Sequence, residues 1–165
     1  MENKFEVLQL EKTEVTCRLC EDFAENALKS KTTAIVGCDG ACVQGEIARR
    51  MANHLAYNKN PEEYARICLG SAITKDTGQR KLIRNLKNLI VIEGCSVKCG
   101  SRLVKAVAPR TDIKVELISS YCDWDKSLFG MNEISHLELE KIATEGADNF
   151  YNKTAIKSEN TSCCG

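Results

Sequence analysis

The sequence predicts an α/β protein, a three-layer doubly wound domain with a mostly parallel four-stranded sheet. Two observations support this prediction. Short runs of β-branched residues alternate with stretches whose apolar residues recur every three or four positions, which is the pattern of strands joined by crossover helices. The 165 residues contain no linker rich in proline and glycine and no repeat of fixed period, so one domain is expected.

The expected elements alternate along the chain. Strands are expected over residues 32–38, 64–69, 88–95 and 113–118. Helices are expected over residues 18–29, after the first strand with apolar residues at Val43, Ile47, Met51 and Leu55, over 76–86 with Asp76 as N-cap, before Pro109, and over 132–150. The fourth strand alternates apolar and charged residues, as an edge strand does. The domain is expected to cover residues 1–151, followed by a polar, disordered tail over 152–165.

Composition excludes several classes of partner. Lys and Arg number 23, as do Asp and Glu, so the chain lacks the broad basic surface that nonspecific nucleic-acid binding requires. No apolar run reaches the roughly 18 residues of a membrane span. Residues 1–10 mix charged with apolar side chains, unlike a signal peptide. A cytoplasmic protein with neither a nucleic-acid nor a membrane partner is therefore expected.

Ten cysteines in a reducing compartment favour metal binding or redox chemistry over disulfides. Cys38, Cys68, Cys95 and Cys122 each fall at or near the C-terminal end of an expected strand. Ligands bind beyond these ends in parallel sheets, so the four thiols are expected at one edge of the sheet. Packing is the alternative, because free cysteine is among the most buried residue types, and for Cys68 or Cys122 alone the choice stays open.

Two of these cysteines are doubled. Cys38 with Cys42, and Cys95 with Cys99, each form a Cys-x3-Cys across a strand-to-helix turn. A thiolate in such a turn lies near the positive end of the helix dipole, which lowers its pKa. Zinc takes four ligands in a tetrahedron, and two turns supply two each. The sequence thus predicts a thiolate site whose partner is a metal ion, zinc first, while four cysteines also suit an iron–sulfur cluster.

Charged and imidazole side chains accompany these cysteines. Asp39 and Glu93 flank them, where a carboxylate tunes a metal ligand from behind or acts as an acid or base. Capping of the following helices is the alternative interpretation. His54 and His136 lie on expected helices away from the cysteines and are interpreted as surface or packing residues.

Three segments carry a resemblance to a known family. They are residues 38–42 (Cys-Asp-Gly-Ala-Cys), 67–70 (Ile-Cys-Leu-Gly) and 92–99 (Ile-Glu-Gly-Cys-Ser-Val-Lys-Cys). They resemble the signature segments of the DGC-domain family, proteins expected to bind zinc and named for an Asp-Gly-Cys triplet. The resemblance spans about residues 32–108 and implies a four-cysteine site whose ligands are Cys38, Cys68, Cys95 and Cys99.

The chain departs from the family pattern at two positions. Glu93 stands where the triplet has aspartate, and Cys42 stands where a serine is usual. The second departure leaves five thiols for four ligand positions. A fifth thiol motivates another hypothesis, a thiol or persulfide redox protein or sulfur carrier that uses the same cysteines.

Four further cysteines lie outside this set. Cys17 and Cys20 form a Cys-x2-Cys at the start of the first expected helix, and Cys163 and Cys164 end the tail. They form either a second thiol site or a partly buried pair with an unrelated tail. A cysteine phosphatase is not supported, because the Cys-x5-Arg spacing places Gln44 or Ser101 at the arginine position. The sequence assigns no reaction.

Overall fold

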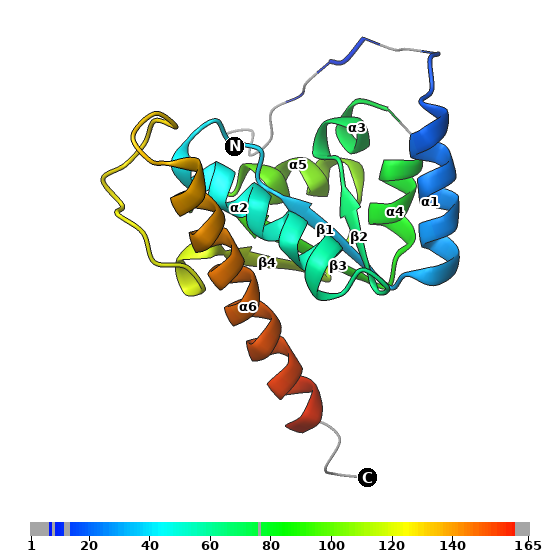
Figure 1. Ribbon diagram of the computed structural model, residues 1–165. Helices are drawn as coiled ribbons and strands as arrows, with labels where there is room; N and C mark the ends of the chain where they lie inside the picture. The colour runs from blue at the N-terminus through cyan, green and yellow to red at the C-terminus, as the bar shows by residue number, and fades with distance from the viewer. Residues whose placement is uncertain (1–6, 8, 12–13, 76, 161–165) are drawn as a thin grey trace, which may run out of the picture.

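The computed structural model describes residues 7, 9–11, 14–75 and 77–160 (Figure 1). Four parallel strands form one sheet in the order β2-β1-β3-β4. The strands are β1 (Thr33–Gly37), β2 (Tyr64–Ile67), β3 (Asn88–Glu93) and β4 (Ile113–Leu117). The predicted α/β class and the edge position of the fourth strand are confirmed, and every pairing is parallel.

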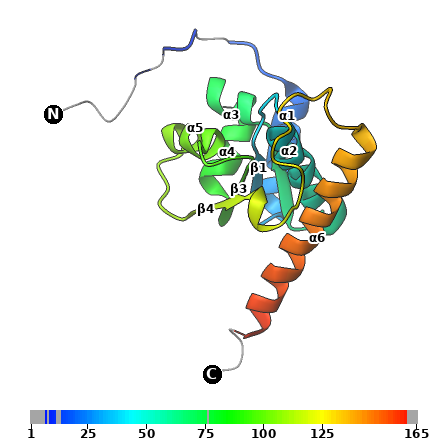
Figure 2. The same cartoon turned by 90° about the vertical axis from the view of Figure 1, so that its left-hand side faces the viewer.

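Helices cover both faces of the sheet and complete three layers (Figure 1 and Figure 2). One face carries α1 (Arg18–Ser30), α3 (Leu69–Thr74), α4 (Gly78–Asn85) and α5 (Cys99–Val107). The other carries α2 (Val43–His54) and α6 (His136–Asn160). β1 serves both apolar cores, since Val36 joins the first and Ile35 the second. The central strands are therefore continuous apolar runs, buried on both faces.

Several boundaries differ from the expectations. The end of the second expected strand instead begins α3, with Cys68 as its N-cap. A π-helical turn (Leu55–Lys59) and a 3-10 turn (Ile118–Ser120) also occur. The N-cap of α4 is Thr77, so the expectation for Asp76, which itself lies outside the described residues, was wrong. Such short elements leave too few residues for a periodic pattern.

The last helix is longer than expected. α6 begins at His136 and continues to Asn160, so residues 152–160, expected in a disordered tail, are helical. Neither glycine nor proline occurs between residues 147 and 160, and polar residues alone do not end a helix. Cys163 and Cys164 lie outside the described residues. No helix within the described part of the chain combines the length and apolar character that crossing a membrane requires.

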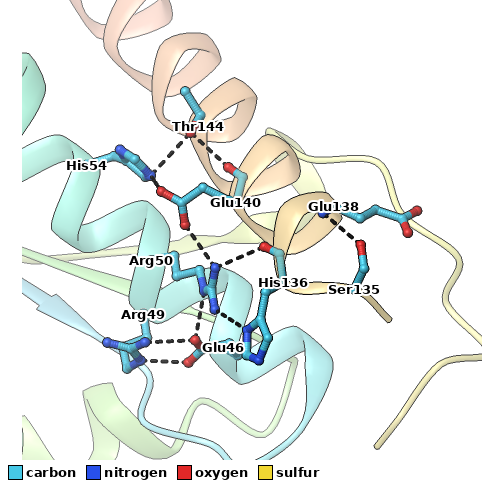
Figure 3. A network of polar contacts seen from close by, with 9 residues as sticks. All are labelled: Glu46, Arg49, Arg50, His54, Ser135, His136, Glu138, Glu140 and Thr144. Atoms are coloured by element: carbon cyan, nitrogen blue, oxygen red, sulfur yellow. Dashed lines mark hydrogen bonds and ion pairs between the residues drawn. The ribbon is translucent and has the colours of Figure 1, made fainter. Parts of the chain in front are cut away.

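A polar network joins α2 to α6 (Figure 3). Arg50 donates to Glu46 at 2.7 Å and, across the helix pair, to Glu140 at 2.9 Å and to the His136 carbonyl at 3.2 Å. The His54 ring lies 2.8 Å from Glu140. Both histidines therefore take part in helix packing. The network holds α2, which begins directly after Cys42, against the body of the protein.

Substitution of Glu46 tests this network. Hydrogen bonds from Arg49 and Arg50 lower the pKa of Glu46 from 4.5 to about 2. Because the folded-state pKa is the lower one, the stabilisation is present above about pH 4.5 and is lost as the pH falls towards 2. Glu46→Gln should lower the free energy of unfolding by about 1–2 kcal/mol at pH 7 and by less at about pH 3, measured by urea denaturation.

The matched control is Asp22→Asn, which removes an exposed ion pair with Arg18. It should change the free energy of unfolding by less than about 0.5 kcal/mol. An equal loss for Glu46→Gln at both pH values would contradict the assigned role.

Candidate functional site

The carboxyl ends of the parallel strands bring five thiols to one edge of the sheet. Cys38 directly follows β1, Cys68 directly follows β2, and Cys95 follows β3 after one residue. Cys42 is the N-cap of α2, and Cys99 is the first residue of α5. All of these are free thiols, and each is at least partly exposed. Two strand-to-helix turns, 38–42 and 95–99, hold four of them.

The first turn folds back onto its own helix. The sulfurs of Cys38 and Cys42 each lie 3.6 Å from the position that a Cβ on Gly40 would take, so they are at most twice that distance apart. A Cβ on Gly45, inside α2, would lie 2.6 Å from the Gly40 Cα and carbonyl oxygen. Only glycine at position 45 permits this approach. The turn that holds both thiols is therefore packed against the first turn of α2.

The second turn is closed by a buried carboxylate. Glu93 is 1% exposed, and it accepts the backbone N–H of Ser101 at 2.6 Å and that of Gly100 at 3.4 Å. These N–H groups belong to the first turn of α5, which has no partners for them within the helix. Lys98 adopts the left-handed conformation, with φ of 55°, and turns the chain into the helix. Glu93 thus caps α5 and fixes the loop that carries Cys95 and Cys99.

The two turns meet at Gly94. A Cβ there would lie 2.8 Å from the carbonyl carbon and oxygen of Gln44, so the end of β3 packs directly on the start of α2. The backbone N–H groups of Gly94 and Gly40 hydrogen bond to the Cys38 sulfur. Burial nevertheless raises the pKa of Cys38, and these hydrogen bonds offset the rise only in part. An N–H group from each turn therefore faces one sulfur.

Cys122 takes no part in this arrangement. Its sulfur packs against Gly146 in the middle of α6, in the place where a side chain at that position would begin. Burial raises the pKa of the Cys122 thiol to about 12. Of the two interpretations open for this residue, the geometry supports packing.

A second set of thiols lies on the other side of β1. Glu21 of α1 accepts the Gly78 N–H at the start of α4, at 2.7 Å, and this contact docks α1 beside the end of β2. Cys20 and Cys68 consequently line one cleft of about 500 Å³. Cys17, the N-cap of α1, is hydrogen bonded to Cys20, which lowers the pKa of Cys17 and raises that of Cys20.

The described residues contain no group of three or more His, Cys, Asp or Glu side chains already arranged to hold a metal ion. The thiols instead form two sets. Cys38, Cys42, Cys95 and Cys99 lie on the two turns. Cys20 and Cys68 line the cleft, and Cys17 is hydrogen bonded to Cys20 without lining the cleft itself. Sequence spacing identified the first set. The meeting of Cys20 with Cys68 was missed, because α1 precedes the alternating strands and helices and its docking depends on a tertiary contact.

A model of the DGC domain matches residues 34–144. The chain belongs to the DGC-domain family. The match begins within β1 and ends within α6, so the DGC domain includes the whole sheet but for the first residue of β1, together with both Cys-x3-Cys turns. Cys17 and Cys20 precede it. Comparison with curated proteins finds no match, and comparison with solved structures finds none either.

The contact beneath the first turn can be tested with a pair of glycine substitutions. Gly45→Ala should lower the free energy of unfolding by about 1–3 kcal/mol, because the new methyl group meets backbone that cannot rotate away. Helix propensity alone would favour alanine by about 1 kcal/mol, so a loss reports the contact. Thermal denaturation of the metal-free protein measures it.

Gly70→Ala is the matched control, since no atom lies within 4 Å of a Cβ at that position in α3. Its stability should equal that of the wild type or slightly exceed it. A wild-type melting temperature for Gly45→Ala would mean that Gly40 is not held against α2.

Proposed function

We propose that this protein binds one zinc ion through the thiolates of the two Cys-x3-Cys turns. The observation that carries the proposal is the meeting of these turns at Gly94, beyond the carboxyl ends of β1 and β3. β2 lies on one side of β1 and β3 on the other, so the chain changes direction across the sheet at this point. Ligands of open parallel sheets bind at such a switch point.

The donor set suits zinc. Cys38, Cys42, Cys95 and Cys99 would supply four sulfur ligands, the composition of a closed zinc site. The nearby carboxylate of Glu93 is engaged with the N-terminus of α5 and is not needed as a ligand. When bound, a zinc ion with four thiolates keeps no open position, so it would stabilise the thiolates and the turns without activating water.

Hydrogen-bond donors around the turns support a negatively charged centre. Burial raises the pKa of the Cys38 thiol, and the backbone N–H groups of Gly94 and Gly40 offset part of that rise by favouring the thiolate. The indole N–H of Trp124 is buried and lacks a partner among the described residues, and Trp124 lines a cavity of about 270 Å³ together with Cys95. Buried donors without acceptors are rare, and a thiolate sulfur in this cavity is a suitable acceptor. Such donors lower the cost of gathering four thiolates.

Metal binding would draw the four sulfurs of the two turns together. No three ligands are assembled among the described side chains, but each of the four thiols is at least partly exposed. Rotation of short side chains on a fixed backbone is a small change. The capped loop that follows β3 and the glycine contact at α2 supply the fixed backbone.

Metal content is the first test. Protein purified without chelator should hold about one zinc per chain by elemental analysis, and Cys38→Ala and Cys95→Ala should each reduce it strongly. Cys122→Ala, at the packing position, should leave it unchanged. Less than about 0.3 metal per chain, unaltered by added zinc, would sink the proposal. Brown protein with stoichiometric iron and sulfide would assign the same sulfurs to an iron–sulfur cluster.

The fourth ligand is the second test. Resemblance implies Cys68, whereas the geometry favours Cys42, whose sulfur flanks Gly40 together with that of Cys38. Cys42→Ala should weaken zinc affinity by more than about tenfold and Cys68→Ala by less than about threefold, measured by competition with a coloured chelator. The reverse order would assign the ligand to Cys68.

A further inference from the structure

The cleft shared by Cys20 and Cys68 is not used by the proposed zinc site. It has a volume of about 500 Å³ and lies beyond the carboxyl ends of β1 and β2, beneath the first turns of α1. Phe23 and Leu69 contribute apolar walls, and Arg66 contributes a cation. Asp39 also lines the cleft. A pocket with apolar walls and a few polar or charged groups is typical of a small-molecule site.

One cleft thiol, Cys20, forms a dithiol with Cys17, which is its neighbour but does not line the cleft. Cys17 is exposed and caps α1, a helix of 13 residues. Cys20, one turn further, is less exposed, and its backbone N–H bonds to the Cys17 carbonyl at 3.0 Å. Hydrogen bonding from the Cys20 backbone N–H, and then from the Cys20 thiol, lowers the pKa of Cys17. An exposed first thiol with a second thiol behind it is the arrangement used in thiol–disulfide exchange.

Arg66 supplies a site for an anion. Its Nε donates to the Asn53 side chain at 2.8 Å, and Nη1 donates to the Ile67 carbonyl. Nη2 lies 3.1 Å from the position that a Cβ on Gly37 would take, so the guanidinium rests on the backbone of β1. Within the described part of the chain no carboxylate pairs with it. Asp39, which also lines the cleft, is exposed. A guanidinium in this setting favours a ligand carboxylate.

We propose that Cys17 and Cys20 reduce small organic disulfides that carry a carboxylate and bind in this cleft. The carboxylate pairs with Arg66, and the organic body lies against Phe23 and Leu69. Neither thiol belongs to the proposed zinc ligands or to the matched DGC domain, so this activity is independent of the metal.

The exchange balances without another reactant. The Cys17 thiolate attacks one sulfur of the disulfide, whose S–S bond breaks and releases a first thiolate that takes up a proton. Cys20 then loses its proton and attacks the Cys17 sulfur, releasing the second thiol. Two protein thiols have been oxidised to the Cys17–Cys20 disulfide, and the substrate disulfide has been reduced to two thiols.

The test uses full-length, reduced, zinc-loaded protein and one equivalent of dithiobis(nitrobenzoate), a disulfide with a carboxylate on each ring. Mass spectrometry of rapidly quenched samples should find the Cys17–Cys20 disulfide first in the wild type. Cys20→Ala should trap the mixed disulfide on Cys17. Cys17→Ala should abolish the fast phase of the reaction, in which the added disulfide reacts with the dithiol. Cys122→Ala, which alters a thiol packed against α6 and outside the cleft lining, is the control and should retain the fast phase. First reaction at Cys68, or a fast phase that survives Cys17→Ala, would overturn the dithiol assignment.

The anion site is tested by charge selectivity. Arg66→Met should slow the fast phase with dithiobis(nitrobenzoate) by about tenfold and leave the rate with neutral hydroxyethyl disulfide unchanged. The rate with the neutral disulfide shows whether the dithiol of the variant keeps its reactivity. Arg102→Met, which removes an exposed arginine of α5, should change neither rate. Equal slowing with both disulfides, or with neither, would overturn the role of Arg66.

Discussion

β1 and β3 pair in parallel at the centre of the sheet, and the Cys38 N–H, just past the end of β1, donates to the Ile92 carbonyl of β3 at 2.8 Å. This extension of the ladder places the first residue of one Cys-x3-Cys turn beside the strand that leads into the other. The zinc site proposed for the two turns depends on this pairing of β1 with β3. A one-residue slip in register would separate the turns and would move the side chains of the slipped strand from each apolar core into the other.

Two further contacts convert this pairing into a fixed frame. Gly94 and Gly45 let backbone segments approach more closely than any side chain would permit. Glu93 is buried, which would be costly for an unpartnered carboxylate, but it accepts two N–H groups that α5 leaves unsatisfied. The positive end of the α5 dipole stabilises the buried carboxylate of Glu93, and the carboxylate in turn provides acceptors for the first N–H groups of the helix. The thiols themselves stay at least partly exposed on a frame held by other residues.

The sequence was sufficient for the elements that are buried on both sides. β1 and β3 are continuous apolar runs, and α2 repeats its apolar residues every four positions, so their patterns admit one interpretation. α3 has six residues, too few for a period, and the end of α6 carries no stop signal. The positions of the cysteines after the expected strands likewise predicted that they lie at one edge of the sheet. They did not predict that the cysteines form two sets.

The division into two sets required tertiary structure. Glu21 caps α4 from another helix, and a Cβ on Gly78 would lie 2.5 Å from that of Ala24. Nothing local in either segment indicates the other, yet this docking places Cys20 near Cys68. Capping was foreseeable for Glu93, which precedes α5 in sequence by a few residues. It was not foreseeable for Glu21, which acts on a backbone N–H group 57 residues away.

Separate thiol sets would allow one small protein to combine the two proposed kinds of sulfur chemistry, metal binding and thiol–disulfide exchange. A thiolate that ligates zinc shares its electron pair with the metal, so four of the thiols would be withdrawn from exchange. Cys17, Cys20 and Cys68 stand across β1, where the N-terminus of α1 and the guanidinium of Arg66 shape their surroundings. In the proposed zinc site Cys42 would be the fourth ligand, and the cysteine left over from the set that the resemblance implies would be Cys68. Its exposed thiol then faces the cleft and not the metal.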